Sequence, residues 1–333
     1  MCQSTMIDRF TAEIRSYRPS DFEEYLRLLA DAERLDPVGR CVSPSCVLEQ
    51  LERPNYSPGQ DLFIAWNERM AGYADVRPES PLGRVVLDCW VRPEHRRQGL
   101  ATRLLCAAAA RAWSLGAVVM HVDIAEHNPL AANVLSKLSF SPVRQFLELR
   151  LDLTRVGGVV RDGLPARSGA GVDRNGLTWR YLQPGDEEQL TELQNRAFAE
   201  NWGYSPNTVE EIAFRTKSGA CACEDIMMVY SGNTAIGYCW TGMTCEQGLP
   251  STRRGRILML GVDPGYTGRG IGRGLVLAGL TRLKCKGLSI VELTVDREND
   301  VACALYRSLG FEIQAQTISY ERTVRPVLAE PAN

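Results

Sequence analysis

The chain has 333 residues, about the length of two domains. Its 38 lysines and arginines nearly balance its 40 aspartates and glutamates, so no strong net charge is available to attract nucleic acid or an anionic membrane surface. No apolar stretch approaches the ~20 residues that span a bilayer, and residues 1–10 are too polar for a secretory signal. We therefore expect a cytoplasmic protein acting on a small molecule, with neither nucleic acid nor membrane as a partner.

The eleven cysteines are scattered, apart from the close pair Cys221 and Cys223. In a large intracellular chain this pattern favours free thiols over disulfides. We expect no bound metal, because the three histidines, His95, His121 and His127, lie far along the chain from that pair. His121 and His127 flank a predicted strand and are expected to be structural.

The sequence contains an internal duplication. Residues 91–101, VRPEHRRQGLA, return as residues 262–272, VDPGYTGRGIG, at a shift of 270 − 99 = 171. The same shift relates Gly116 to Gly287, whereas upstream segments match at 186 − 21 = 165. Copy two therefore carries 171 − 165 = 6 extra residues, which we place within 241–256. A repeat of this length predicts two similar domains.

In chain order, each copy predicts a strand, two helices, a hairpin, a long strand, a loop that opens a helix, a buried strand, a short helix and a last strand. In copy one we expect these elements at 13–17, 21–35, 45–53, 62–65, 71–77, 85–91, 100–115, 118–124, from about 129, and 146–153. In copy two we expect them at 178–181, 187–200, 208–216, 226–230, 235–240, 257–262, 271–286, 290–295, 301–309 and 317–323.

This order predicts a mixed α/β fold of the α+β kind, with one twisted sheet flanked by helices in each domain. The expected domains are residues 11–153 and 177–326. Between them, the glycine-rich segment 154–176 is typical of a linker.

The repeated loop follows a Val-x-Pro strand end and leaves backbone N–H groups free at a helix N-terminus, which favours phosphate binding. It is not a Walker loop, because Gly-Lys-Ser and Gly-Lys-Thr are both missing. It is not a dinucleotide fingerprint either, because Arg273, not glycine, stands three residues after Gly270.

The pattern Gln/Arg-x-x-Gly-x-Gly/Ala after a Val-x-Pro strand end resembles the GNAT superfamily of acyl-coenzyme A N-acyltransferases. The matching residues are Arg96, Gly99 and Ala101 in copy one, and Gly270 and Gly272 in copy two. Copy two has Thr267 where Gln or Arg is usual. Its later segment 299–311, NDVACALYRSLGF, also resembles the family's later helix at each landmark. The resemblance covers essentially all of both halves.

This resemblance implies acetyl-coenzyme A as the cofactor, with its diphosphate on the loop amides and its pantetheine arm along the preceding strand. Glycines at the loop let a phosphate approach the backbone closely. The implied contacts in copy two are Leu260, Val262, Thr267, Gly268, Arg269, Gly270, Ile271, Gly272, Arg273 and Asn299. In copy one they are Val91, Arg96, Arg97, Gln98, Gly99, Leu100 and Ala101.

Acyl transfer to an amine needs an acid for the departing thiolate and somewhere for the amine proton to go. The resemblance gives the acid role to Tyr306, although a tyrosine at this helical position also packs well. Its counterpart in copy one, at 306 − 171 = 135, is Leu135, so copy one is expected to be degenerate.

The general base is less clear. Tandem-domain members of the mycothiol synthase type, which the chain resembles overall, place a carboxylate where this chain has Arg256. Glu292 on the neighbouring strand and a water chain are the candidate substitutes; the alternative for Glu292 is an ordinary solvent-facing strand residue.

We therefore expect an acetyl-coenzyme A-dependent N-acetyltransferase that acts on a primary amine of a small molecule. Its chemistry lies in the C-terminal half, and its two domains form an internal pseudo-dimer within a monomer. Asn201, Trp202 and Tyr204, with the enlarged segment 241–256, are candidates for the acceptor pocket.

Two alternatives stay open. A non-catalytic acyl-coenzyme A binding or sensing protein is favoured by the missing base and by Thr267. A GNAT enzyme acting on a protein amine would be favoured by an open acidic groove.

Overall fold

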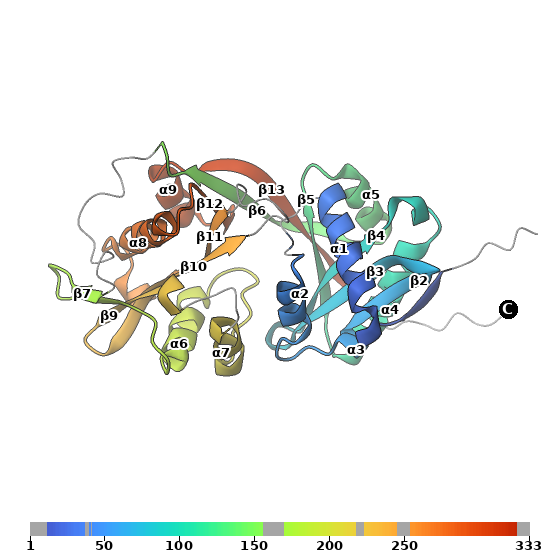
Figure 1. Cartoon of the computed structure of the whole chain (residues 1–333), viewed down its shortest axis with the longest axis horizontal. Helices are drawn as coiled ribbons and strands as arrows, with labels where there is room; N and C mark the ends of the chain where they lie inside the picture. The colour runs from blue at the N-terminus through green and yellow to red at the C-terminus, as the bar shows by residue number, and fades with distance from the viewer. Residues whose placement is uncertain are drawn as a thin grey trace, which may run out of the picture.

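The computed structural model describes residues 12–36, 40, 42–155, 170–217, 223–244 and 254–324. Figure 1 shows the two halves of the chain side by side, with two long strands, β6 and β13, passing between them. Parts of two expected segments, 156–169 of the linker and 245–253 of the enlarged insertion, lie outside the described residues.

The first half contains β1 (Glu13–Ser16), α1 (Phe22–Leu35), α2 (Pro44–Leu51), α3 (Pro58–Asp61), β2 (Leu62–Asn67), β3 (Arg69–Glu79), β4 (Arg84–Val91), α4 (Leu100–Ser114), β5 (Val119–Ala125), α5 (Pro129–Lys137) and β6 (Ser141–Asp152). The second half contains β7 (Ala170–Val172), β8 (Thr178–Tyr181), α6 (Glu187–Phe198), α7 (Val209–Lys217), β9 (Ile226–Ser231), β10 (Thr234–Thr244), β11 (Arg254–Val262), α8 (Ile271–Cys285), β12 (Ile290–Asp296), α9 (Asp300–Ser308) and β13 (Glu312–Thr323). Each predicted element is present. The sequence pattern did not predict α3 or β7, and β7 falls inside the expected linker.

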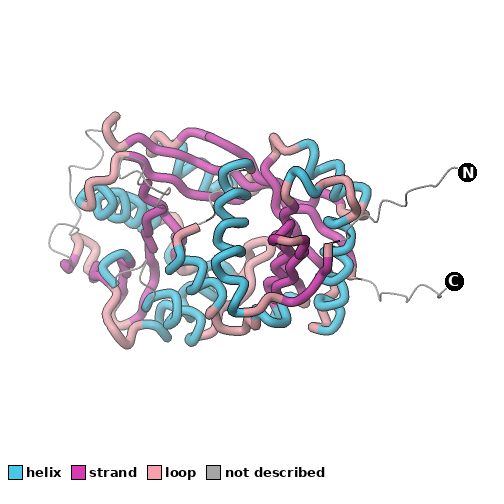
Figure 2. Tube along the Cα trace, turned by 45° about the vertical axis from the view of Figure 1, so that its right-hand side comes forward, coloured by secondary structure: helices cyan, strands magenta, loops and turns pink. Residues whose placement is uncertain are grey.

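The mixed α/β fold is confirmed, but the prediction of one sheet per copy was wrong. The described strands form a single thirteen-stranded sheet in the order β1-β2-β3-β4-β5-β13-β6-β12-β11-β10-β9-β8-β7. The last strand of each half is exchanged: β13 pairs with β5 from Thr317–Ala125 to Thr323–Val119, and β6 pairs with β12. In Figure 2 the strands that join the halves run along the top of the molecule. Alternating apolar residues fix which face a strand buries but not its partner, so the exchange was invisible in the pattern.

The exchanged strands contribute to the core of the opposite half. Leu147 and Leu149 of β6 pack in one apolar cluster with Leu275 and Leu283 of α8. Burying one such side chain stabilises the fold by ~1.5–3 kcal/mol, so the interior fixes β6 against the second half. Reciprocally, Tyr320 of β13 packs in the cluster that α4 covers.

Within the described residues, no helix is long and apolar enough to cross a membrane. No group of three or more histidine, cysteine, aspartate or glutamate side chains there is placed to hold a metal ion. The cysteines in these ranges, such as Cys223, Cys239 and Cys303, are free thiols, whereas Cys221 lies outside them.

Candidate active site

The parallel strands β11 and β12 separate early. They pair at Gly255–Val291 and Arg256–Glu292, and the pairing ends there. In the first half the equivalent strands β4 and β5 stay paired from Arg84–Val119 to Leu87–Val122. The gap between β11 and β12 is therefore longer than its counterpart and begins at Ile257 on β11.

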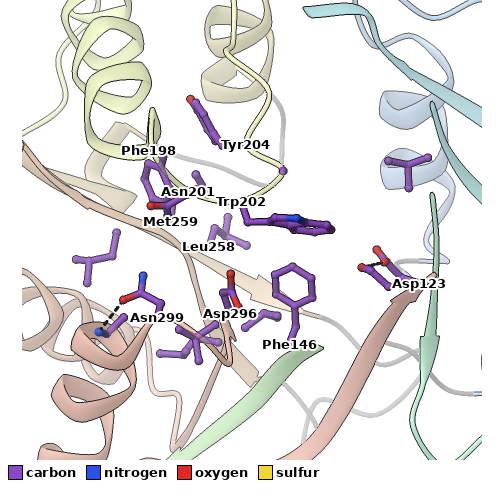
Figure 3. Close-up of a pocket in the computed structure, with 18 of the residues that line it drawn as sticks. Asp123, Phe146, Phe198, Asn201, Trp202, Tyr204, Leu258, Met259, Asp296 and Asn299 are labelled. Carbon is purple, nitrogen blue, oxygen red and sulfur yellow. Dashed lines mark hydrogen bonds between the residues drawn. The ribbon is translucent and has the colours of Figure 1, made fainter. Parts of the chain in front are cut away.

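A cavity of about 530 Å³ begins at this gap and extends between the two halves. Second-half elements contribute Phe198, Asn201, Trp202, Gly203, Tyr204, Ile257, Leu258, Met259, Leu260, Leu293, Thr294, Val295, Asp296, Asn299, Ala302, Tyr306 and Ser319. First-half elements contribute Arg77, Glu79, Arg84, Val86, His121, Asp123 and Phe146. In Figure 3, Asn299 lies on one side of the cavity and Asp123 on the other, with Trp202 and Phe146 between them. The cavity therefore has a second-half end and a first-half end.

The loop before α8 has the conformation that an anion site requires. Gly268 and Gly270 adopt φ angles of 75° and 79°, in the left-handed region that favours glycine, and Gly270 caps α8. A Cβ atom added at either position would meet nothing within 4 Å, so both glycines face open space. The first amides of α8, from Ile271 to Arg273, precede the first bond of the helix, from the Gly274 amide to the Gly270 carbonyl, and have no partner within it.

Two arginines of the second-half loop lie beside this helix end. The guanidinium of Arg269 donates to the Gly265 carbonyl at 3.1 Å and lies over the Tyr266 ring. That of Arg273 donates to the Ser308 hydroxyl at 2.9 Å. Both cations add to the positive potential of the N-terminus of α8.

Tyr306 lies on the inward face of α9, which begins with the Asn299 side chain accepting from the Ala302 amide at 3.0 Å. Its ring is 6% exposed and packs edge-on against Phe311 at 5.6 Å. Burial raises the pKa of the Tyr306 phenol well above its usual value. The phenol therefore keeps its proton at neutral pH and lines the same cavity as Leu260 and Asn299.

Glu292 and Arg256 are both engaged in ion pairs. Glu292 accepts from Arg150 of β6 at 2.7 Å and from Arg254 at 3.0 Å, and it is not among the residues lining the cavity. Arg256 pairs with Glu148 of β6 at 3.5 Å and donates to the Thr294 hydroxyl at 2.7 Å. The expected base candidate is thus a bridging carboxylate between the exchanged strand and β11.

The three acceptor candidates, Asn201, Trp202 and Tyr204, all line the cavity. The Tyr204 hydroxyl donates to the Asn195 side chain at 2.7 Å. The Trp202 ring stacks on His121 of the first half, with centroids 5.5 Å apart and an interplanar angle of 16°.

The sequence pattern indicated no site role for the first-half residues that line the cavity. They include Arg84, Asp123 and His121, whose Nε2 atom is 2.9 Å from the Glu321 carboxylate on β13. The predicted strand at 118–124 contained two of them, but only the strand exchange brings them opposite the second-half loop. No local signal in the sequence carried that information.

In the first half, the corresponding loop keeps its backbone shape, and Gly99 also faces open space. Gly99 caps α4 with a φ of 77°, and Leu100 beyond it is buried. The Nε atom of Arg96 donates to the Val91 carbonyl at 2.9 Å, and its guanidinium lies over the Trp90 ring.

The other first-half candidates are arranged as follows. Arg97 is a non-glycine residue with a φ of 59°, and the Gln98 side chain donates back to the Glu94 carbonyl at 3.2 Å. Ala101 is half-buried and packs against the core. Of these side chains, that of Gln98 turns back onto its own loop.

A helix N-terminus with open glycines, two parallel strands that separate before it, and a cavity lined by a protonated phenol are features that suit an acyl-coenzyme A-dependent acyltransferase. The chain belongs to the acetyltransferase (GNAT) family, whose family model matches residues 22–140 and 187–311. It is accordingly an N-acetyltransferase that uses acetyl-coenzyme A.

Relatives and solved structures resemble this chain over most of its length, the relatives in sequence and the solved structures in fold. A mycothiol acetyltransferase of Thermobispora bispora is 30% identical over 318 residues, covering 93% of this chain and 98% of the relative. One from Actinosynnema mirum is 30% identical, covering 91% and 96%. A tandem GNAT protein from the clavulanic acid biosynthesis pathway shares the fold with a TM-score of 0.65 at 18% identity, covering 94% and 99%. A GCN5-related N-acetyltransferase from Sphaerobacter thermophilus has a TM-score of 0.68 at 23% identity, covering 95% and 96%.

Proposed function

We propose that this enzyme acetylates a primary amine of a small molecule, and that the reaction takes place in the second half. The observation that carries the proposal is that one cavity contains Leu260 of the strand gap, the buried phenol of Tyr306 and the acceptor candidate Trp202. Cofactor-side and acceptor-side residues therefore share one cavity.

The second-half loop fits coenzyme A because open space lies outside Gly268 and Gly270 and unpaired amides follow them. The amides of α8 would hold the diphosphate, and the main chain at Leu260 and Val262 would hold the pantetheine arm. When bound, acetyl-coenzyme A supplies the thioester. Tyr306 holds a proton on its hydroxyl inside the cavity and serves as the general acid there.

Three carboxylates line the cavity, and each is already engaged. Glu79 pairs with Arg84, Asp296 pairs with Arg144, and Asp123 accepts from the Ser319 hydroxyl. Because the position expected for a base is Arg256, we propose that the amine proton leaves through water in the cavity rather than to a dedicated carboxylate.

Two features of the first half support chemistry in the second. Leu135 replaces the tyrosine and has no proton to donate. The carbonyl of Val91, at the strand end before the loop, already accepts from Arg96. The volume of the cavity and its place between the halves favour a small acceptor over a folded protein. The mycothiol acetyltransferase relatives make mycothiol-related amines the first acceptors to test.

The test is to measure thiol release from acetyl-coenzyme A by the purified protein with a panel of amines. The panel holds aminosugars, cysteinyl amines protected at sulfur, and short peptides with a free N-terminus or lysine. We expect turnover with a small amine, confirmed by the mass of the acetylated product. Binding of acetyl-coenzyme A with no product from any amine would favour the sensing alternative. Turnover confined to the peptides would favour the protein-amine alternative.

A further inference from the structure

The segment 199–208, here called the acceptor loop, joins α6 to α7 and carries the three acceptor candidates. One side of it is fixed by its own half. The Asn195 side chain donates to the Asn207 carbonyl at 3.0 Å and accepts from the Tyr204 hydroxyl at 2.7 Å. These bonds anchor the end of the loop near α7.

The opposite side of the acceptor loop is held by the first half. The Trp202 ring lies against His121 of β5 and against Phe146 of β6 at 6.2 Å. The guanidinium of Arg144, also on β6, lies 5.5 Å from the same ring. Figure 3 shows Trp202 projecting from its own loop toward these first-half strands. The ring therefore depends on the first half for its position.

One first-half side chain bonds directly to the loop backbone. Arg84 begins β4 and lies opposite Glu79 of β3, to which its Nε atom donates at 2.5 Å. Its Nη2 atom donates to the Gly203 carbonyl at 2.5 Å. Arg84 is 9% exposed, so this charge-assisted bond is shielded from water.

Gly203 is required at the point where the two halves meet. Its φ of 68° lies in the left-handed region, and an added Cβ atom would stand 2.7 Å from Nη1 of Arg84. The backbone can approach the guanidinium this closely because it has no side chain there.

We propose that Arg84 is a positioning residue for the acceptor amine: through Gly203 it fixes the acceptor loop, and with it the Trp202 wall of the cavity. The expected effect of Arg84 on amine kinetics rests on the proposed function, whereas the contact between Arg84 and Gly203 does not. Arg84 lies on a strand of the half that lacks the catalytic tyrosine, so the degenerate copy supplies part of the acceptor site. The cofactor-side residues lie on β11, on α8 and α9 and at the loops before these helices, and the contact between Arg84 and Gly203 involves none of them.

The test compares Arg84→Gln and Arg84→Lys with Arg111→Gln as a matched control. Arg111 also pairs with a buried first-half carboxylate, donating to Asp61 at 2.8 Å, but does not line the cavity. In Arg84→Gln we expect faster hydrogen exchange in peptides covering the acceptor loop, with acetyl-coenzyme A binding unchanged by calorimetry. Arg84→Lys keeps the positive charge but cannot bond two acceptors at once as a guanidinium does. It should therefore recover part of the protection of the acceptor loop against hydrogen exchange.

The kinetic measurement uses the amine of the panel with the highest turnover. We expect the KM for that amine to rise about 10- to 100-fold in Arg84→Gln, the scale of an Å-sized misplacement, while the KM for acetyl-coenzyme A stays the same. Unchanged loop exchange, or faster exchange with an unchanged amine KM, would overturn the proposal. If the wild type acetylates no amine, the proposed function fails, and the exchange comparison with Arg111→Gln still decides the role of Arg84 in holding the loop.

Discussion

The Nε atom of Arg96 donates a hydrogen bond to the main-chain carbonyl of Val91 across 2.9 Å. The equivalent pair in the second half is Thr267 and Val262, and there the threonine hydroxyl donates instead to the Pro264 carbonyl at 3.0 Å. In the second half, Thr267 replaces the Gln or Arg that is usual in the family, and its side chain does not bond to the Val262 carbonyl at the end of the strand. In the first half, the family's usual residue turns back onto the strand.

We therefore predict one acetyl-coenzyme A site per chain, abolished by Gly270→Glu. The carboxylate would stand at the helix end beside the diphosphate, and its repulsion should weaken binding by on the order of 100-fold or more. Isothermal titration calorimetry gives both affinity and stoichiometry.

The matched control is Gly99→Glu. Gly99 and Gly270 share the same cap conformation, with φ angles of 77° and 79°, and both face open space. The two variants therefore carry the same backbone strain, and only Gly270→Glu should lose acetyl-coenzyme A binding. If the wild type instead binds two molecules of acetyl-coenzyme A per chain and each variant binds one, then both loops bind the cofactor.

Replacing Tyr306 with phenylalanine should lower turnover by about 10²–10⁴-fold, the usual contribution of one positioned acid. The ring contact with Phe311 is kept, so stability and the affinity for acetyl-coenzyme A should change little. Steady-state kinetics with the best amine, together with calorimetry, separates these effects. Turnover equal to that of the wild type would remove Tyr306 from the mechanism and leave it a packing residue.

A second matched pair tests the stability of the two halves. Tyr73 and Tyr238 are equivalent in the repeat and both fully buried, but the Tyr73 hydroxyl donates to Asp88 at 2.6 Å, whereas that of Tyr238 has no hydrogen-bond partner among the described residues. Tyr73→Phe should reduce the free energy of unfolding by ~1–3 kcal/mol, because Asp88 loses a donor. Tyr238→Phe should be neutral or stabilising by up to ~1 kcal/mol, because an unpaired buried hydroxyl is removed. Urea denaturation measures both, and equal losses would contradict the contrast.

Buried phenols also predict alkaline instability. Burial raises the pKa of Tyr25, Tyr73 and Tyr238 well above the usual value of about 10. Above pH ~10 the unfolded chain loses these protons while the folded chain keeps them, so the free energy of unfolding falls as pH rises, by ~1.4 kcal/mol per pH unit for each phenol. Urea midpoints between pH 8 and pH 11 measure this fall. Tyr238→Phe should make it shallower, and an unchanged slope would exclude that phenol as a contributor.

The sequence allowed prediction of the residues whose placement depends on local structure. Gly270 lies at a helix cap and Tyr306 on the inward face of α9 because strand, loop and helix are consecutive in the chain. Arg84, by contrast, meets Gly203 across 119 residues, and Glu292 meets Arg150 across 142. Both contacts follow from the strand exchange, which hydrophobic alternation cannot specify.

The exchange makes a further prediction: a chain cut between residues 156 and 169 should remain one particle. The first piece keeps β6, which pairs with β12 at seven positions from Ile290–Asp152 to Asp296–Phe146, and the second keeps β13, which pairs with β5 at seven. A protease site inserted in this segment, followed by size-exclusion chromatography and native mass spectrometry, tests this. We expect the cut protein to elute as the intact chain does and to keep its acetyl-coenzyme A binding. Each piece made alone should aggregate or stay unfolded, because the apolar face of one exchanged strand and the edge it covers are then exposed. A second piece that folds and binds acetyl-coenzyme A by itself would show that β12 does not need β6.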